Sequence, residues 1–113
     1  MNQDMAGFNP AYPSLWEKAA LDHVEQDRIC VQGSGYLLAC DLTASGGNAT
    51  ATIHDGVNNN GRVLMPVAAL QNYSAHFCCR YPRRFEQGLF VDLSANVGNC
   101  VVMYVTDKAL QTK

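Results

Sequence analysis

The chain has 113 residues, of which 48% are hydrophobic and 16% are charged, and its formal net charge is −2. A chain of this size and composition can bury one core, so we expect a single folded domain. Partners rich in phosphate attract clustered lysine and arginine, and this chain has no excess of them, so we expect no nucleic-acid partner and no membrane partner.

Residues 1–26 differ in character from the rest of the chain. Residues 1–13 contain two prolines and a glycine, which favour an extended arm over a helix. Residues 15–24 are rich in good helix formers, so we predict a short helix there. The segment has neither a basic start nor a continuous apolar run, so we expect no signal peptide and no membrane span.

Three aromatic side chains are spaced along this arm, and we consider them candidate partner-binding residues: Phe8, Tyr12 and Trp16. Aromatic side chains in an extended segment are exposed unless another surface covers them. The arm is therefore expected to fold either over a neighbouring molecule or over its own domain, and both alternatives remain open.

Residues 35–56 carry the clearest strand pattern of the chain. A first strand places these residues on one face: Tyr36, Leu38, Cys40, Leu42 and Ala44. A second strand alternates in the same way, with an apolar face of Ala49, Ala51 and Ile53. Small residues at 44–48 suit a tight reversal of the chain. We therefore predict a β-hairpin.

Strand-length segments also occupy the remainder of the chain, at residues 28–32, 62–70, 74–81, 88–94 and 99–106. Pro66 restricts its segment to a sheet edge or an early end, whereas residues 99–106 are apolar on both faces and should be central. A loop dense in glycine and asparagine at 55–61 separates two of these segments.

The absence of a helical pattern between these segments predicts an all-β fold. We expect an antiparallel β-sandwich or jelly-roll of about seven strands at residues 27–107, with an extended N-terminal arm at 1–26. The unequal strand lengths favour these folds over a closed barrel. Residues 108–113 are polar and are expected to form a tail.

The five cysteines are odd in number and lack C-x-x-C spacing: Cys30, Cys40, Cys78, Cys79 and Cys100. Each lies within or beside an apolar stretch, so we predict reduced, buried side chains, typical of a protein made in a reducing cytoplasm. Strand alternation should send Cys78 and Cys79 to opposite faces.

No residue pattern supports catalysis. His54 precedes Asp55, but neighbours on a strand point to opposite faces, and a strand end explains the Asp-Gly pair. The three histidines show none of the paired spacing with cysteine that zinc sites have. Ser34 lacks the first glycine of a nucleophile elbow. We therefore expect a non-enzymatic protein with no cofactor and no metal.

Residues 80–84 form the only basic cluster, in which an aromatic side chain stands among arginines. Arginine and tyrosine are enriched at recognition surfaces, so we consider these candidate partner-binding residues: Arg80, Tyr81, Arg83 and Arg84. The alternative is a solvated loop between two strands.

Two phrases of the sequence carry a resemblance to a known class of proteins. They are Ala51-Thr52-Ile53-His54-Asp55-Gly56 and Phe85-Glu86-Gln87-Gly88-Leu89-Phe90-Val91. With the strand segments around them, from residue 35 to residue 105, the chain resembles small β-sandwich virion structural proteins of tailed bacteriophages.

The resemblance implies a non-enzymatic virion component that assembles in the host cytoplasm as a homo-oligomer. Its partners would be the phage capsid, as for a decoration or cement protein, or neck or tail proteins. The alternative is a carbohydrate- or receptor-binding module of a phage fibre, with Tyr81, Arg83 and the loop at 58–60 lining a shallow site. An enzyme that depends on His54 is the third class.

Overall fold

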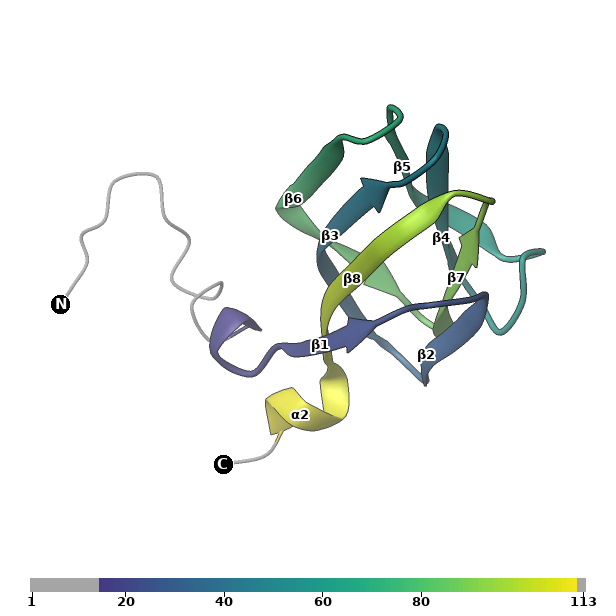
Figure 1. Ribbon diagram of the computed structural model, residues 1–113. Coiled ribbons are helices and arrows are strands. Elements are labelled where there is room, and N and C mark those ends of the chain that lie inside the picture. Colours follow the sequence, from purple (N-terminus) through teal and green to yellow (C-terminus); the bar gives the residue numbers. More distant parts are fainter. Residues whose placement is uncertain (1–14, 112–113) are drawn as a thin grey trace, which may run out of the picture.

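The computed structural model describes residues 15–111, which form two four-stranded antiparallel sheets (Figure 1). Sheet A contains, in spatial order, β1 (Ala20–His23), β8 (Val97–Thr106), β3 (Gly35–Ala44) and β6 (Ser74–Phe85). Sheet B contains β2 (Arg28–Gln32), β7 (Gly88–Leu93), β4 (Ala49–Asp55) and β5 (Arg62–Ala69). A short helix, α2 (Asp107–Gln111), follows β8. The predicted all-β antiparallel sandwich is confirmed, with eight strands in the described part of the chain.

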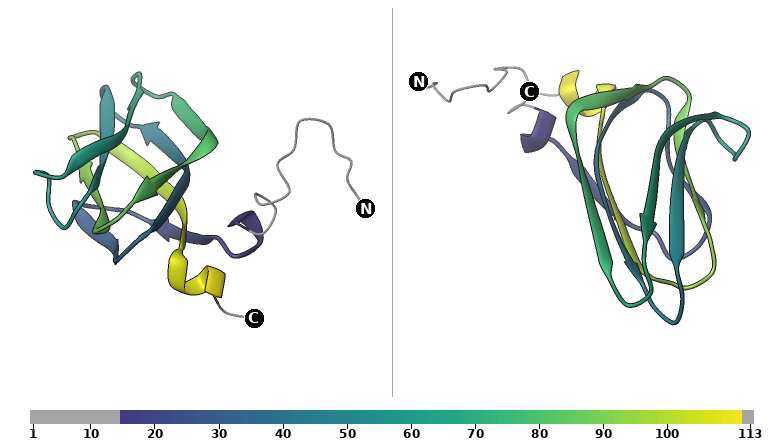
Figure 2. Two further views of the ribbon diagram at one scale, coloured as in Figure 1. Left: turned by 180° about the vertical axis from the view of Figure 1, so that it is seen from behind. Right: turned by 90° about the horizontal axis from the view of Figure 1, so that it is seen from above.

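The two sheets pack face to face, and the main core lies between them (Figure 2). Alternate residues of the strands supply it, as the period of a half-buried strand requires. The side chains that are fully enclosed include Leu37, Leu42, Ile53, Phe85, Leu89, Val91 and Val102. Burying a side chain of this size contributes about 1.5–3 kcal/mol, so this layer stabilises the fold.

The predicted hairpin at residues 35–56 is wrong. Both strands exist, but β3 lies in sheet A between β8 and β6, whereas β4 lies in sheet B between β7 and β5. The small residues at 45–48 therefore carry the chain from one sheet to the other. Each strand has one apolar face. Both faces are buried, because they pack against each other across the core. Alternation alone reports the buried face and not the strand's partner.

A β-bulge at Leu38 corrects the predicted face of β3. The pairing of β3 shifts between Leu37 and Ala39 in its ladders with both β6 and β8. Leu37 and Cys40 therefore point into the main core, while Leu38 lies on the other side of sheet A. Tyr36 was predicted to share a face with Cys40, and it also packs on the outer side.

A second apolar group, which we call the outer cluster, covers one end of the outside of sheet A. Its buried residues are Leu15, Leu38 and Val105, and the partly buried residues packed against them are Trp16, Ala19, Tyr36, Met103, Ala109 and Leu110. Part of the predicted polar tail thus forms α2 and packs here. The apolar residues of α2 are too few to show a pattern in the sequence, but they suffice to dock one helical turn.

The helix predicted at 15–24 is confirmed only at residues 15–17, because β1 begins at Ala20. β1 pairs with β8, so four residues of the predicted arm belong to sheet A. Helix propensity is a weak preference in so short a segment, and the ladder to β8 outweighs it.

Several expectations about individual strands are confirmed. β5, which contains Pro66, is an edge strand of sheet B, and β8 is central in sheet A. Cys79 is buried and Cys78 is exposed, so the two side chains do point to opposite faces. The prediction that every cysteine is buried is wrong at Cys78, since the outward face of β6 meets solvent.

Candidate interaction surface

The basic cluster lies within β6 and not in a loop, and a wide bulge divides it. Leu37 pairs with Arg83 and Ala39 pairs with Cys78, so Leu38 alone stands opposite residues 79–82 of β6. We call residues 79–82 the β6 bulge. Because Pro82 has no N–H group, the interruption of the ladder between β6 and β3 leaves no backbone donor without a partner at this residue. The chain is forced outward, away from β3.

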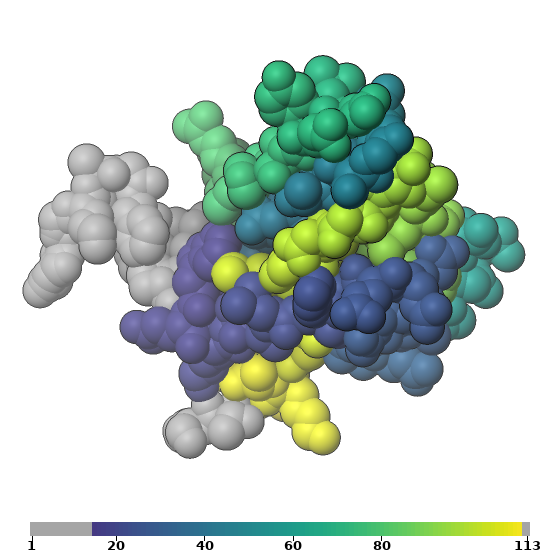
Figure 3. Space-filling view, viewed as in Figure 1, coloured from purple at the N-terminus to yellow at the C-terminus, as the bar shows by residue number. Residues whose placement is uncertain are grey.

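Arg80 and Tyr81 project from this bulge. The Tyr81 side chain is 66% exposed, and the Arg80 guanidinium carbon lies 5.8 Å from the centre of the Tyr81 ring. Within the described part of the chain, Arg80 forms no ion pair. Figure 3 shows this light-green segment standing out from the body of the protein. A charged and aromatic pair thus faces solvent on a strand that is held at both ends.

Arg83 and Arg84, on the other side of the bulge, have intramolecular partners. Arg83 Nη1 donates to the backbone carbonyl of Leu64 on β5. Arg84 makes two parallel hydrogen bonds to the Asp107 carboxylate, at 2.6 and 2.7 Å, and its guanidinium carbon lies 5.0 Å from the centre of the Tyr36 ring. These contacts tie β6 to β5 and to the start of α2.

The Asp107 carboxylate also accepts a hydrogen bond of 2.6 Å from the Ser34 hydroxyl. The hydrogen bonds from Arg84 and from Ser34 lower the pKa of Asp107, and the same ion pair raises the pKa of Arg84. The carboxylate therefore stays charged, and it holds the first turn of α2 against the β2–β3 turn. The sequence gives no signal for this pairing because 23 residues separate Arg84 from Asp107.

Of the aromatic residues predicted in the arm, Phe8 and Tyr12 lie outside the described residues. Trp16 is partly buried and packs on the outer cluster of its own domain. Leu15, its neighbour, is only 8% exposed. The chain is thus anchored to sheet A at the point where the described part begins.

The two phrases that carry the resemblance are joined directly in the structure. The Asp55 carboxylate of the first phrase accepts the backbone N–H groups of Glu86 and Gln87, both in the second phrase, at 2.9–3.1 Å. The Gly56 N–H donates to the Gly88 carbonyl at 3.1 Å. A Cβ atom at Gly88 would approach the Gly56 carbonyl oxygen to 2.8 Å, so only glycine fits without a shift. The phrases therefore specify how the β6–β7 turn docks on the end of β4.

Asp55 is held as a structural carboxylate. Partial burial raises its pKa, but the hydrogen bonds from Gln87 and Glu86, together with Arg62 at 3.3 Å, outweigh burial and lower it. His54 points elsewhere: its Nδ1 lies 3.0 Å from the Gly61 carbonyl, and the side chain is buried beside Phe90. The predicted divergence of the two neighbours is confirmed, and Asp55 does not orient the imidazole.

The shallow site expected for a carbohydrate does not form from the residues proposed for it. The loop at 58–60 closes on itself, since Asn58 Oδ1 accepts the Asn60 N–H at 2.9 Å. Figure 3 shows this teal loop and the light-green bulge on opposite sides of the molecule. Arg83, the third element of that site, is bound to β5.

Within residues 15–111, no three His, Cys, Asp or Glu side chains gather into a possible metal site. No helix in this range is long and apolar enough to cross a membrane. No known protein family, curated protein or solved structure matches the chain. The arrangement of residues described above is therefore the basis for any functional conclusion.

Proposed function

We propose that this protein is a non-enzymatic structural component of a tailed-phage virion, assembled in the host cytoplasm. It would bind the capsid, as a decoration or cement protein, or bind neck or tail proteins. The observation that carries this proposal is the preformed pair of Arg80 and Tyr81 on the β6 bulge. Tyrosine and arginine held on a rigid element are the anchors on which protein interfaces most depend.

The contacts between the two phrases support the resemblance on which the virion assignment depends. Short phrases of turn and core residues can recur by chance, but here they meet through Asp55 and the β6–β7 turn. In this chain the two phrases thus form one junction, at which the β6–β7 turn docks on the end of β4.

We also assign the connectivity to a jelly-roll, as part of the same proposal. Strand orders β1-β8-β3-β6 and β2-β7-β4-β5 support it, because every connection between consecutive described strands except β4–β5 crosses between the sheets. Jelly-rolls are common in viral capsid proteins and in lectins. This support is an analogy at the level of the fold, and the site must carry the function.

The N-terminal arm would complete the interaction by extending onto a neighbouring subunit. Burial of Phe8 and Tyr12 there would contribute about 1.5–3 kcal/mol each before the cost of ordering the arm. Many weak contacts of this kind reinforce one another when the copies lie on one lattice. Trp16, packed on the outer cluster, would fix the point from which the arm leaves.

The test is an inventory by mass spectrometry of purified virions from the source of this sequence, followed by co-sedimentation of the chain with those particles. We expect the chain in the virions, and binding that falls at least about tenfold for a double Arg80→Ala, Tyr81→Ala variant. Tyr73→Ala is the matched control, because Tyr73 is 69% exposed but lies outside the bulge. Virions that lack the chain would overturn the proposal.

Deletion of residues 1–13 tests the arm separately. A folded domain that no longer joins its assembly is the expected result. Unfolding on deletion would instead place the arm in its own core, which is the alternative that the sequence left open.

A carbohydrate- or receptor-binding module of a phage fibre is the second candidate function. The exposed Tyr81 ring favours it, since an aromatic face beside a guanidinium group can stack on a sugar. Binding of the isolated protein to a glycan array, abolished by Tyr81→Ala, would select this function over a lattice protein.

A further inference from the structure

Sheet A ends on both sides in a strand whose outer edge has no partner in the described part of the chain. β1 pairs only with β8, and β6 pairs only with β3. Between residues 15 and 111, no backbone hydrogen bond outside these ladders involves residues 20–23 or 74–78. Each edge therefore presents a row of backbone donors and acceptors that another strand could bind.

The two free edges run in opposite directions. Each neighbouring pair in sheet A is antiparallel, so across four strands β1 and β6 are antiparallel to each other. A second copy placed beside the first in the same orientation brings its β1 next to β6 of the first. These two strands are then antiparallel as well, and the sheet continues without any subunit being inverted.

The charges at the two edges are complementary. β6 contains three arginines and no carboxylate. Around β1 stand four carboxylates and two cationic side chains, namely Glu17, Asp22, Glu25 and Asp27 with Lys18 and Arg28. Asp22 pairs with Arg28 at 3.3 Å, and Asp27 accepts the Leu93 N–H, whereas no interaction joins Glu17 or Glu25 to another described residue.

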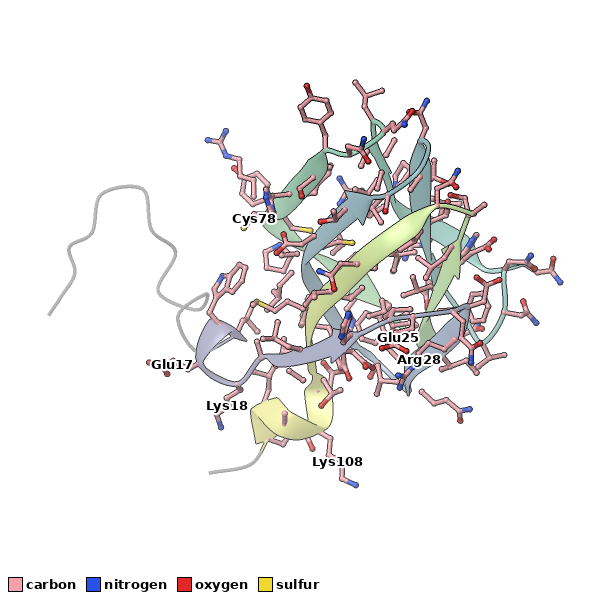
Figure 4. The ribbon with its side chains drawn as sticks, viewed as in Figure 1. Glu17, Lys18, Glu25, Arg28, Cys78 and Lys108 are labelled. Carbon is pink, nitrogen blue, oxygen red and sulfur yellow. The ribbon has the colours of Figure 1, made fainter. Side chains whose placement is uncertain are left out.

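Figure 4 shows Glu17 on the helical turn that precedes β1 and Glu25 beyond the other end of the strand, so each can meet only one end of a neighbouring strand. The register of sheet A decides which one lies level with the bulge. Leu21, Met103, Ala39 and Cys78 form one row across the four strands. Because β1 and β6 are antiparallel, the bulge after Cys78 is level with residues that precede Leu21, on the side of Glu17.

Apolar exposure at the two edges is matched too. Leu21 on β1 is 65% exposed, and Tyr81 on the bulge is 66% exposed. If the row through Leu21 and Cys78 continues into a second copy, Tyr81 approaches the start of the partner's β1. Antiparallel pairing of residues 74–78 with themselves would place each Arg80 beside residues 70–73 of the other copy, which include no carboxylate, and pairing of β1 with β1 would leave the bulge outside the contact. Of these three arrangements, only the head-to-tail one gives Arg80 a carboxylate partner.

We infer that copies of this chain join head to tail through sheet A, with residues 74–78 of one copy pairing antiparallel with β1 of the next. Arg80 and Tyr81 both lie level with residues that precede Leu21 of the next copy, and Arg80 lies against Glu17 there. The inference deepens the proposed assembly role by naming a second copy as one partner. A head-to-tail contact of this kind closes into a ring or continues as a filament.

The test measures self-association of the full chain by sedimentation over about a hundredfold range of concentration. The wild type is expected to form oligomers that dissociate as salt is raised, because the contact between charges is at the surface. Arg80→Glu and Glu17→Arg should each raise the dissociation constant at least about tenfold. Glu25→Arg is the control, since it adds the same charge at the other end of β1, and should have a much smaller effect.

Restoration distinguishes the proposed pairing from a general effect of charge. In an equimolar mixture of the two single variants, the new carboxylate of one faces the new guanidinium group of the other, so association should return. A double Arg80→Glu, Glu17→Arg variant should associate by itself for the same reason. Circular dichroism and thermal melting check that each variant is folded.

A wild-type chain that stays monomeric over the whole range overturns the inference, as does an equal effect of Glu17→Arg and Glu25→Arg. Failure of both the mixture and the double variant to associate also overturns it. None of these results bears on the virion inventory, so a monomeric chain found in virions would leave the proposed function standing. Conversely, an oligomer absent from virions would remove that function and leave this contact intact.

Discussion

The two ends of the arginine-rich run in β6 have opposite environments. Arg83 and Arg84 donate to Leu64 and Asp107, and Phe85 beside them is fully buried. Arg80 and Tyr81, a few residues earlier, stand in solvent. The bulge makes the difference, because Arg80 and Tyr81 lie within the interruption of the ladder to β3, whereas Arg83 and Arg84 pair with β3 after it. Arginines of one strand can therefore be either bonded within the domain or exposed to solvent, according to where the ladder to the neighbouring strand is interrupted.

The largest expected effect is at the buried end of this run. Phe85→Ala should destabilise the protein by about 3–5 kcal/mol, because it opens a cavity in the main core. Phe77→Ala is the control on the same strand, where the side chain is 40% exposed, and should cost less than about 1 kcal/mol. Urea unfolding of both variants measures the difference, and equal losses would contradict the contrast.

Acid should release the contacts of both structural carboxylates. Hydrogen bonds from Arg84 and Ser34 lower the pKa of Asp107, and the backbone donors and Arg62 lower that of Asp55 against the effect of burial. This stability is therefore fully present above the ordinary aspartate pKa of about 3.9, and it is lost as the pH falls through the lower values of the folded state.

Thermal melting between neutral pH and about pH 2 follows this loss. A double Asp55→Asn, Asp107→Asn variant should be less stable at neutral pH, and its melting temperature should fall less steeply as the pH is lowered. If the melting temperature of the variant fell as steeply with pH as that of the wild type, other carboxylates would govern the acid transition.

Asp55→Ala should cost about 1–2 kcal/mol at neutral pH, since it removes the acceptor for two backbone N–H groups of the β6–β7 turn. Asp41→Ala removes an exposed carboxylate bonded to His76 and should change stability by less than about 0.5 kcal/mol. Hydrogen exchange at Glu86 and Gln87 should rise only in the first variant.

The smallest pair of effects returns to the arginines. Arg84→Gln should cost about 1 kcal/mol, because its bidentate ion pair is partly solvated, and should speed hydrogen exchange in α2. Arg80→Gln should leave stability within about 0.5 kcal/mol of the wild type. If Arg80→Gln destabilised the protein as much as Arg84→Gln, the bulge would belong to the folded core and not to an interface.

Much of the fold was predictable because a strand with one buried face has apolar and polar residues in alternation, and this pattern is visible in the local sequence. The strand segments from residue 28 onward, the edge position enforced by Pro66 and the central place of β8 all follow from alternation and from the missing N–H of proline. Alternation fails at Val63, which is 51% exposed although Met65 and Val67 are buried, because the β4–β5 ladder shifts its register between Ile53 and His54.

The division of the basic cluster was not predictable. Nothing local to Arg84 indicates that Asp107 will face it, and nothing near Arg80 indicates that its side of the strand lacks a partner. The exposure of Arg80 depends on Leu38, a residue of another strand at which the pairing of β3 with β6 shifts. The Arg84–Asp107 pair depends on where α2 begins beside β6. Sequence patterns that span a few residues contain no information on such distant pairings.

By itself, the sequence determined where the chain is extended and which side chains must leave water, because these follow from a period of two and from the cost of exposing apolar surface. The tertiary structure decided which sheet each strand joins, where β1 and α2 dock, and which arginines remain exposed. The reason is physical: burial acts on each residue by itself, whereas strand pairing depends on contacts between segments far apart in the chain.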